Sequence, residues 1–552
     1  MPLRILFFIW VTCVPFVAWA ADTPPVPRPN IILILSDDQD WNGLSVRMHP
    51  DIAESRSDYF ETPNLEKFAS QSMRFSNGYA PAPVCSPTRI SLQTGMTPAR
   101  LGWTKAAPAE IGYRLIEGDN RKAIRDEEVT FAELLRKSGY ATAHFGKWHL
   151  SGGGPEKHGY DVSDGDTGNR EAETFKDPNP VDIFGMTDRA KAFMETNQRA
   201  GKPFYLQMSY NALHVPENAN RSSLAKFEAK APGKLHRDPA RAAIAYDLDT
   251  GVGKLLASVA ALGLDKNTYV IYVADNGGGG GGGVKGGKGS SQGLRGGKGG
   301  LWEGGIRVPF IVRGPGVKAD SWCHQPVVGY DFFPTFCRWA GVKDKLPANL
   351  DGGDFSPLLA GINQPVTRRD SALLFHFPHY QGDTPVSSIR EGDLKFVLYY
   401  EDNTRLLFDL AKDPSERNNL VDSRKEDAAR LEAKLRARLQ EAGAKLQGCG
   451  TFAIVKGARC RSSAAIRLPR ELRRVGHHRF PSLCVSSPAC PRRGPVGRAR
   501  PLAMAGAHLP LAGTGRPAPS RAGADPWLRC SQRPLAPQRR PAGRRRLVCV
   551  CP

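Results

Sequence analysis

The central part of the chain contains few cysteines. Of the eleven in its 552 residues, Cys13 lies near the N-terminus and seven follow residue 446, which leaves Cys85, Cys323 and Cys337. So few thiols exclude a fold that depends on a disulfide framework. Cys323 and Cys337 could pair in an oxidising compartment, but we expect two separately buried thiols.

Long apolar runs are also lacking after the first twenty residues. Arg4, the apolar residues 5–17 and the small-x-small pattern of residues 18–20 together predict a signal peptide over residues 1–20. A retained membrane anchor is the less favoured alternative, because the run is short for a membrane span. We therefore expect an exported protein, periplasmic or extracellular, with no stable membrane anchor.

Residues 447–552 contain almost no lysine or acid. This tail has 20 Arg, one Lys, Glu471 and Asp525, a net charge of +19 out of +21 for the whole chain, so the preceding part is nearly neutral. One interpretation is a basic arm that binds nucleic acid, although we expect no nucleic-acid binding by the body. We favour a non-native extension, such as out-of-frame translation, because its cysteines lack metal spacing. Either origin predicts disorder.

Strands alternate with helices in the first two thirds of the chain. Short apolar runs predict strands at residues 30–35, 140–145, 204–210 and 268–274, and helices are predicted after the capping box of Thr130 and Glu133 and over residues 240–262. This alternation favours a mostly parallel sheet covered by helices on both faces. Polar residues gather just after the strands, where such sheets place their chemistry. They are Asp37, Asp38, Lys147, His149, His214, Asp275 and Asn276.

The remaining sequence predicts a second, smaller unit. Residues 277–283 are an unbroken glycine run that we expect to form a mobile loop. Residues 388–400 and 405–410 are typical of antiparallel strands, and residues 424–446 of an amphipathic helix. We therefore predict a catalytic domain over residues 28–364 and an α+β C-terminal subdomain over residues 365–446.

Cys85 lies in a sequence that predicts the start of a helix. Ser86 can cap a helix whose first residue is Pro87. A thiol at that position would have a lowered pKa, and the helix N-terminus would favour an anionic substrate. A buried structural cysteine fits these residues equally well.

Several motifs, in the same order along residues 29–446, resemble those of the sulfatase family. Cys85-x-Pro87-x-Arg89 resembles the motif in which the cysteine is oxidised to formylglycine, and residues 139–149 resemble the second signature. Further blocks are residues 35–38, 211–214, 275–277, 296–299 and 302–307. The resemblance implies an arylsulfatase-like member of the alkaline phosphatase superfamily.

The resemblance also implies a metal site and a set of catalytic residues. The metal ligands would be Asp37, Asp38, residue 85, Asp275 and Asn276, whose oxygen atoms suit Ca²⁺, with Mg²⁺ as the alternative. Arg89 would hold the hydrate of formylglycine and His149 would assist its proton transfers. Lys147 and Lys298 would bind sulfate oxygens, and His214 would protonate or stabilise the leaving oxygen.

By the same resemblance, one hydroxyl of the hydrated aldehyde attacks sulfur, the alcohol leaves, and the second hydroxyl then expels sulfate. The implied partners are a sulfated carbohydrate or aryl sulfate as substrate and a formylglycine-generating enzyme for maturation. One alternative is a phosphodiesterase or phosphonate hydrolase of the same superfamily. Another is a catalytically silent carbohydrate-binding relative, expected if Cys85 is never converted.

Overall fold

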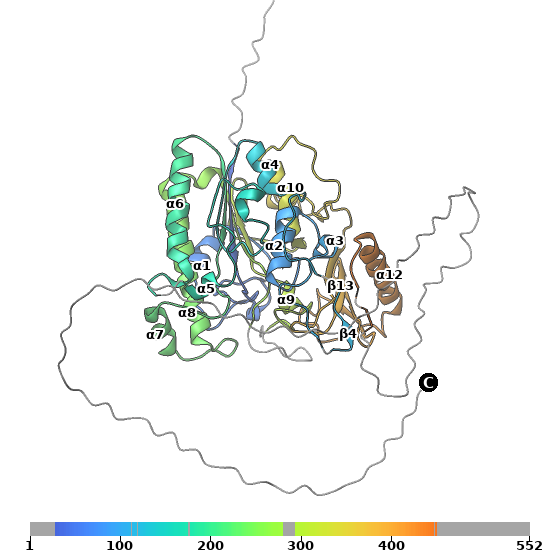
Figure 1. Ribbon diagram of the computed structural model, residues 1–552. Coiled ribbons are helices and arrows are strands. Elements are labelled where there is room, and N and C mark those ends of the chain that lie inside the picture. The colour runs from blue at the N-terminus through green and yellow to red at the C-terminus, as the bar shows by residue number, and fades with distance from the viewer. Residues whose placement is uncertain are drawn as a thin grey trace, which may run out of the picture. The chain divides into compact units, whose positions relative to one another are not determined.

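The computed structural model describes residues 28–111, 113–118, 120–174, 177–279, 293–446 and 448–449 (Figure 1). The predicted signal peptide, most of the glycine run and nearly all of the basic tail lie outside the described residues. No helix in the described part is long and apolar enough to cross a membrane. Cys323 and Cys337 are buried free thiols, which confirms the prediction of two separate cysteines.

An eight-stranded sheet forms the centre of the fold. Its order is β10-β2-β9-β8-β1-β7-β5-β6, and the pairs are parallel except those that β9 makes with β8 and β2. This confirms the predicted mostly parallel α/β fold. The strands are β1 Asn30–Ser36, β2 Met73–Phe75, β5 Ala141–Gly146, β6 Val162–Ser163, β7 Phe204–Ser209, β8 Thr268–Ala274, β9 Phe310–Arg313 and β10 Ser321–Cys323.

Helices cover both faces of this sheet, which is why β1 is buried along its whole length. Alternate residues of β1 enter two cores: Ile32 and Ile34 join one, and Ile31 and Leu33 the other. The first core lies under α1 (Pro63–Ala69), α6 (Ile183–Arg199) and α8 (Pro239–Ala261). The second lies under α2 (Cys85–Thr94), α4 (Phe131–Lys137) and α10 (Phe332–Trp339), on the opposite side in Figure 1.

Two local signals in the sequence act as expected. Thr130 and Glu133 form the predicted capping box of α4, and Asp238 caps α8 by accepting from the backbone N–H groups of Ala240 and Arg241.

The smaller helices and strands are α3 Pro98–Leu101, α5 Glu171–Thr174, α7 Arg221–Glu228, α9 Glu303–Ile306, α11 Ser356–Leu359, β3 Gly78–Tyr79, β4 Leu115–Ile116, β11 Val327–Val328 and β16 Gly448–Cys449.

A four-stranded antiparallel sheet follows near the C-terminal end of the described chain. It consists of β12 Leu373–Phe377, β13 Val386–Glu391, β14 Leu394–Tyr399 and β15 Arg405–Asp409, and α12 (Lys425–Glu441) packs on it. The predicted antiparallel strands are present, but residues 388–400 are divided between β13 and β14, and β12 is an additional strand. Helix α12 ends before the predicted residue 446, because Gly443 takes the left-handed conformation that stops a helix. The boundary at residues 364 and 365 stays a prediction.

Candidate active site

Four polar side chains meet where two neighbouring strands end. Strands β1 and β8 pair in parallel with Ser36 opposite Ala274, so the residues that follow them lie side by side. The backbone N–H of Asp275 donates to the Ser36 carbonyl at 3.0 Å, and that of Asp38 to Asp275 Oδ1 at 3.2 Å. Asp37, Asp38, Asp275 and Asn276 are therefore brought together by strand pairing, and all four are buried.

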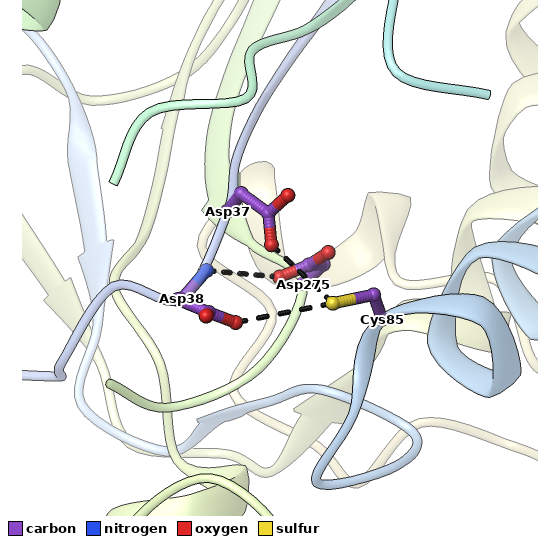
Figure 2. A group of neighbouring side chains, drawn as sticks. All are labelled: Asp37, Asp38, Cys85 and Asp275. Carbon is purple, nitrogen blue, oxygen red and sulfur yellow. Dashed lines mark hydrogen bonds between the residues drawn. The ribbon is translucent and has the colours of Figure 1, made fainter. Parts of the chain in front are cut away.

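Cys85 enters this group from helix α2 (Figure 2). Its Sγ lies 3.4 Å from Asp37 Oδ1 and 3.9 Å from Asp38 Oδ1. One ligand atom from each of Cys85, Asp37, Asp38 and Asp275 lies within 4.8 Å of the other three. Segments that are far apart in the sequence thus converge on one small volume.

The start of helix α2 differs from the prediction in one detail. The helix begins at Cys85 rather than Pro87, and Ser86 makes no cap. The Ser86 hydroxyl instead donates to the backbone carbonyl of His149 at 2.9 Å, which ties the helix to the segment that follows β5. Cys85 still occupies the first turn of the helix, as expected.

The expectation of a lowered thiol pKa is wrong. Burial, reinforced by the negative charge of Asp37, raises the pKa of Cys85 well above its ordinary value. The helix N-terminus does not offset this, because the thiol is fully enclosed and faces carboxylates. A protonated thiol is a poor nucleophile, so an unmodified Cys85 is unsuited to catalysis by its own sulfur.

Arg89, one turn along the same helix, organises the carboxylates. Its Nε and Nη2 donate to Asp275 Oδ2 at 3.0 and 2.8 Å, and its Nη1 donates to the Lys147 carbonyl at 2.5 Å. Its Nη2 also lies 3.5 Å from Asp37 Oδ2. The structure therefore shows Arg89 as a support for two carboxylates.

Two lysines approach the same carboxylates from different loops. Lys147, which is completely buried after β5, donates to Asp37 Oδ2. Lys298 donates to Asp38 Oδ2 at 2.6 Å, and its side chain is 20% exposed. Although burial by itself would raise the pKa of Asp37, Lys147 and Arg89 hold it well below its usual value. The site thus combines three carboxylates with three side-chain cations.

Two histidines complete the predicted set. Burial, together with Lys147 and Arg89, lowers the pKa of His149 to about 2, so its imidazole is neutral, and its Nδ1 has no partner among the described residues. His214 Nδ1 donates to the Val215 carbonyl at 2.7 Å, which leaves Nε2 facing Asp38 Oδ2 at 3.9 Å. Both rings therefore lie at the carboxylate cluster with one nitrogen available.

The donor set fits a divalent cation. The Asn276 amide nitrogen donates to Asp38 Oδ1 at 2.7 Å, while its buried Oδ1 has no hydrogen-bond partner among the described residues. An orphaned buried carbonyl oxygen beside three carboxylates is costly unless a cation compensates it. Oxygen ligands of this kind are those that hard cations such as Ca²⁺ and Mg²⁺ prefer.

One supporting residue was missed by the sequence interpretation. Arg241 lies buried on α8, donates to the backbone carbonyl of Asp38, and donates to that of Leu213 at 3.2 Å. It holds the backbone around the carboxylates and lies 3.6 Å from Asp40 Oδ2. Its only signal in the sequence is a lone arginine in the apolar part of a helix, which does not reveal its partners.

Comparison with known proteins agrees with this geometry. Residues 29–342 match the model of the family described as "Sulfatase", and residues 297–445 match "N-sulphoglucosamine sulphohydrolase, C-terminal". The chain belongs to the sulfatase family and is a sulfuric ester hydrolase. The family description supports sulfate-ester hydrolysis.

Individual relatives point the same way. Arylsulfatase A of Bos taurus is 30% identical over 469 residues, covering 74% of this chain and 86% of its own. N-acetylgalactosamine-6-sulfatase of Mus musculus is 32% identical over 60% of this chain and 66% of its own. The solved structure of Ps i-CgsB in complex with k-i-k-neocarrahexaose is 25% identical, with a TM-score of 0.61 over 75% of this chain and 93% of that one.

Proposed function

We propose that the enzyme hydrolyses sulfate monoesters through a formylglycine made from Cys85, beside a Ca²⁺ ion bound by Asp37, Asp38, Asp275 and Asn276. The observation that carries this proposal is the convergence of Cys85 Sγ with three carboxylates within 4.8 Å. Burial raises the pKa of the Cys85 thiol, which makes the unmodified side chain a poor nucleophile and so supports conversion. Mg²⁺ is the alternative ion.

When present, the cation supplies charge that polarises a sulfate oxygen, and the hydrated aldehyde supplies a nucleophilic hydroxyl. Arg89 holds Asp275 through two hydrogen bonds and so fixes the ligand that β8 contributes. Lys147 and Lys298 direct their ammonium groups at the same cluster, where they bind oxygens of an incoming sulfate group. Three side-chain cations balance three carboxylates, so a bound divalent ion leaves a net positive site that favours an anionic substrate.

The two histidines handle protons. His149 is neutral and has an imidazole nitrogen without a partner among the described residues, so it can accept a hydrogen bond from the nucleophilic hydroxyl and orient it. His214 presents Nε2 from the loop after β7. Because its Nδ1 proton is used on the Val215 carbonyl, the ring protonates the leaving oxygen from Nε2 only in its doubly protonated form, which the negative charge of a bound sulfate ester favours. Water exclusion is provided by the burial of every carboxylate in the site.

The substrate class that we propose is a sulfated carbohydrate. The names of N-acetylgalactosamine-6-sulfatase and N-sulphoglucosamine sulphohydrolase refer to sulfated sugars, and a third relative was solved with a neocarrahexaose. Export, which the first twenty residues predict, would give the enzyme access to extracellular polysaccharides. Conversion of Cys85 requires a formylglycine-generating enzyme as a maturation partner.

Mass spectrometry of the active protein tests this proposal. The peptide that contains residue 85 should have lost the mass that separates a thiol from an aldehyde, and release of sulfate from 4-nitrophenyl sulfate should follow the converted fraction. Cys337→Ala, at a buried cysteine outside the site, is the matched control and should leave that activity unchanged. An active preparation in which residue 85 is entirely cysteine would refute the proposed nucleophile.

A further inference from the structure

A second cavity lies next to the loop that carries Lys298. It has a volume of about 650 Å³, and this loop lines it with Arg295 and Trp302, while Asp383 lines it from the segment between β12 and β13. The two segments touch: a Cβ added to Gly382 would lie 2.7 Å from the Lys298 carbonyl oxygen. The same short loop therefore presents a lysine to the reaction site and forms one wall of this cavity.

Aromatic rings held by carboxylates line the cavity. In each of three pairs a tyrosine hydroxyl is hydrogen-bonded to a neighbouring carboxylate, which fixes the orientation of the ring and leaves further lone pairs of the carboxylate available. The pairs are Tyr113 with Glu110, Tyr380 with Glu401 at 2.9 Å, and Tyr399 with Asp383 at 2.8 Å. Tyr113 and Tyr380 also stack in parallel, 4.1 Å apart.

The charge of this cavity is opposite to that of the reaction site. Four carboxylates line it, those of Glu110, Asp383, Glu401 and Asp402, whereas Arg295 is the one cation among its lining residues. The Arg295 guanidinium lies 3.5 Å from the centre of the Trp302 ring and also donates to the Glu416 carbonyl, so it is already engaged. Arg114 lies near the rim, close to Asp402. An excess of carboxylates opposes entry of a sulfate group.

A sugar without charge fits this lining. Its hydroxyl groups can donate to the carboxylates, and its apolar faces can pack on the tyrosine and tryptophan rings, as in many concave sites that combine aromatic walls with a few polar groups. A fully sulfated chain would bring a second anion against four carboxylates, which is a repulsive element of the kind that produces specificity.

We propose that this cavity is a subsite for an unsulfated, uncharged sugar next to the sulfated one. The inference rests on the proposed action on carbohydrates and narrows it to glycans in which a sulfated sugar has a neutral neighbour. The acidic lining selects against chains that carry sulfate on every sugar, and the ring of Tyr113, which is 39% exposed, packs against the neutral sugar.

The test uses Tyr113→Ala, with Tyr246→Ala as the matched control. Tyr246 is a partly exposed tyrosine on α8 that lines neither the reaction site nor the cavity. With defined oligosaccharides that carry one sulfated sugar beside neutral ones, Tyr113→Ala should lower kcat/KM at least tenfold, mainly through KM. Both variants should turn over 4-nitrophenyl sulfate like the wild type, because this compound has no second sugar.

Charge removal gives an independent readout. Glu401→Gln combined with Asp402→Asn should increase turnover of a fully sulfated oligosaccharide at least fivefold relative to the singly sulfated one, whereas Asp265→Asn, at a distant exposed aspartate, should not. Equal losses in Tyr113→Ala and Tyr246→Ala, or wild-type preference for fully sulfated chains, would overturn the subsite. Failure of the wild type to cleave 4-nitrophenyl sulfate would instead count against the proposed reaction, so the two failures are distinguishable.

Discussion

Two buried groups of charges in this enzyme differ in how their acidic side chains are arranged. In the subdomain ion network, defined by Glu303, Lys395, Glu416 and Arg307, Lys395 lies 2.9 Å from one glutamate and 2.8 Å from the other, and Arg307 lies 2.8 Å from Glu303. Each carboxylate there faces a cation of the chain. The network joins β14 of the four-stranded sheet to α9, so its balanced charges serve to hold structure.

The active site has lysine and arginine partners too, yet its acidic groups crowd together. Three carboxylates and a thiol meet within 4.8 Å, and an amide oxygen beside them lacks a partner among the described residues. Three side-chain cations match the three carboxylates in number, but they surround this volume, whereas Lys395 in the ion network bridges its two glutamates. The comparison teaches that burial and charge are common to both groups, whereas three carboxylates crowded around a thiol mark the functional one.

The largest effect should come from residue 85. Cys85→Ala removes the residue that we propose as the source of the nucleophile, so sulfate release from 4-nitrophenyl sulfate should fall by at least about 10⁴-fold, as for other lost nucleophiles. The fold should be retained, since a small side chain replaces another. Residual activity within tenfold of the wild type would show that Cys85 does not carry the chemistry.

Removing the cation should have the next largest effect on the active site. Chelation, or Asp275→Asn, should lower kcat by about 10²–10³-fold, which is the scale of a lost electrostatic stabiliser. Added Ca²⁺ should restore the chelated wild type but not the variant. As the contrasting control, Glu303→Gln in the ion network should not change the dependence of activity on calcium. If Glu303→Gln changed this dependence as much as Asp275→Asn does, the distinction between the two groups would be contradicted.

Disrupting the ion network should affect stability in place of chemistry. Lys395→Met leaves Glu303 and Glu416 buried without their shared cation, which should lower the free energy of unfolding by about 3–5 kcal/mol. Denaturant titration measures this loss, and kcat per folded molecule should stay unchanged. Adding Glu303→Gln and Glu416→Gln to the Lys395→Met variant should recover part of the lost stability. An unfolding midpoint of Lys395→Met equal to that of the wild type would show that the network does not stabilise the fold.

The smallest effect concerns acid sensitivity outside both groups. Burial lowers the pKa of His376 to about 4, so this ring is neutral in the folded protein but binds a proton in the unfolded chain below about pH 6.5. Its contribution to stability is present above pH 6.5 and is lost as pH falls toward 4. His376→Gln should therefore flatten the pH dependence of Tm between pH 6.5 and 4; an identical slope in wild type and variant would refute the linkage.

The sequence allowed the sheet and the approximate site to be predicted, because both depend on local signals. The apolar runs that became β1 and β8 end directly before Asp37 and Asp275, so the strand pattern alone brings those residues to one edge. The capping box of Thr130 and the apolar spacing of α8 are equally local.

Long-range contacts could not be predicted in this way. The raised pKa of Cys85 depends first on burial and then on Asp37, both of which arise only after folding, whereas the predicted helix N-terminus suggested a lowered pKa. The pairings of Arg89 with Asp275, of Arg241 with the Asp38 backbone, and of Lys395 with Glu303 join segments more than ninety residues apart. Such long-range pairings leave no periodic pattern in the sequence from which the partners could be predicted.

A crystal structure of the active protein in the presence of Ca²⁺ tests the central claim most directly. We predict a single ion at oxygen-ligand distances of about 2.3–2.6 Å from Asp37, Asp38, Asp275 and Asn276, with formylglycine or its hydrate at position 85. An ion bound elsewhere, or an unmodified Cys85 in a fully active crystal, would contradict the account.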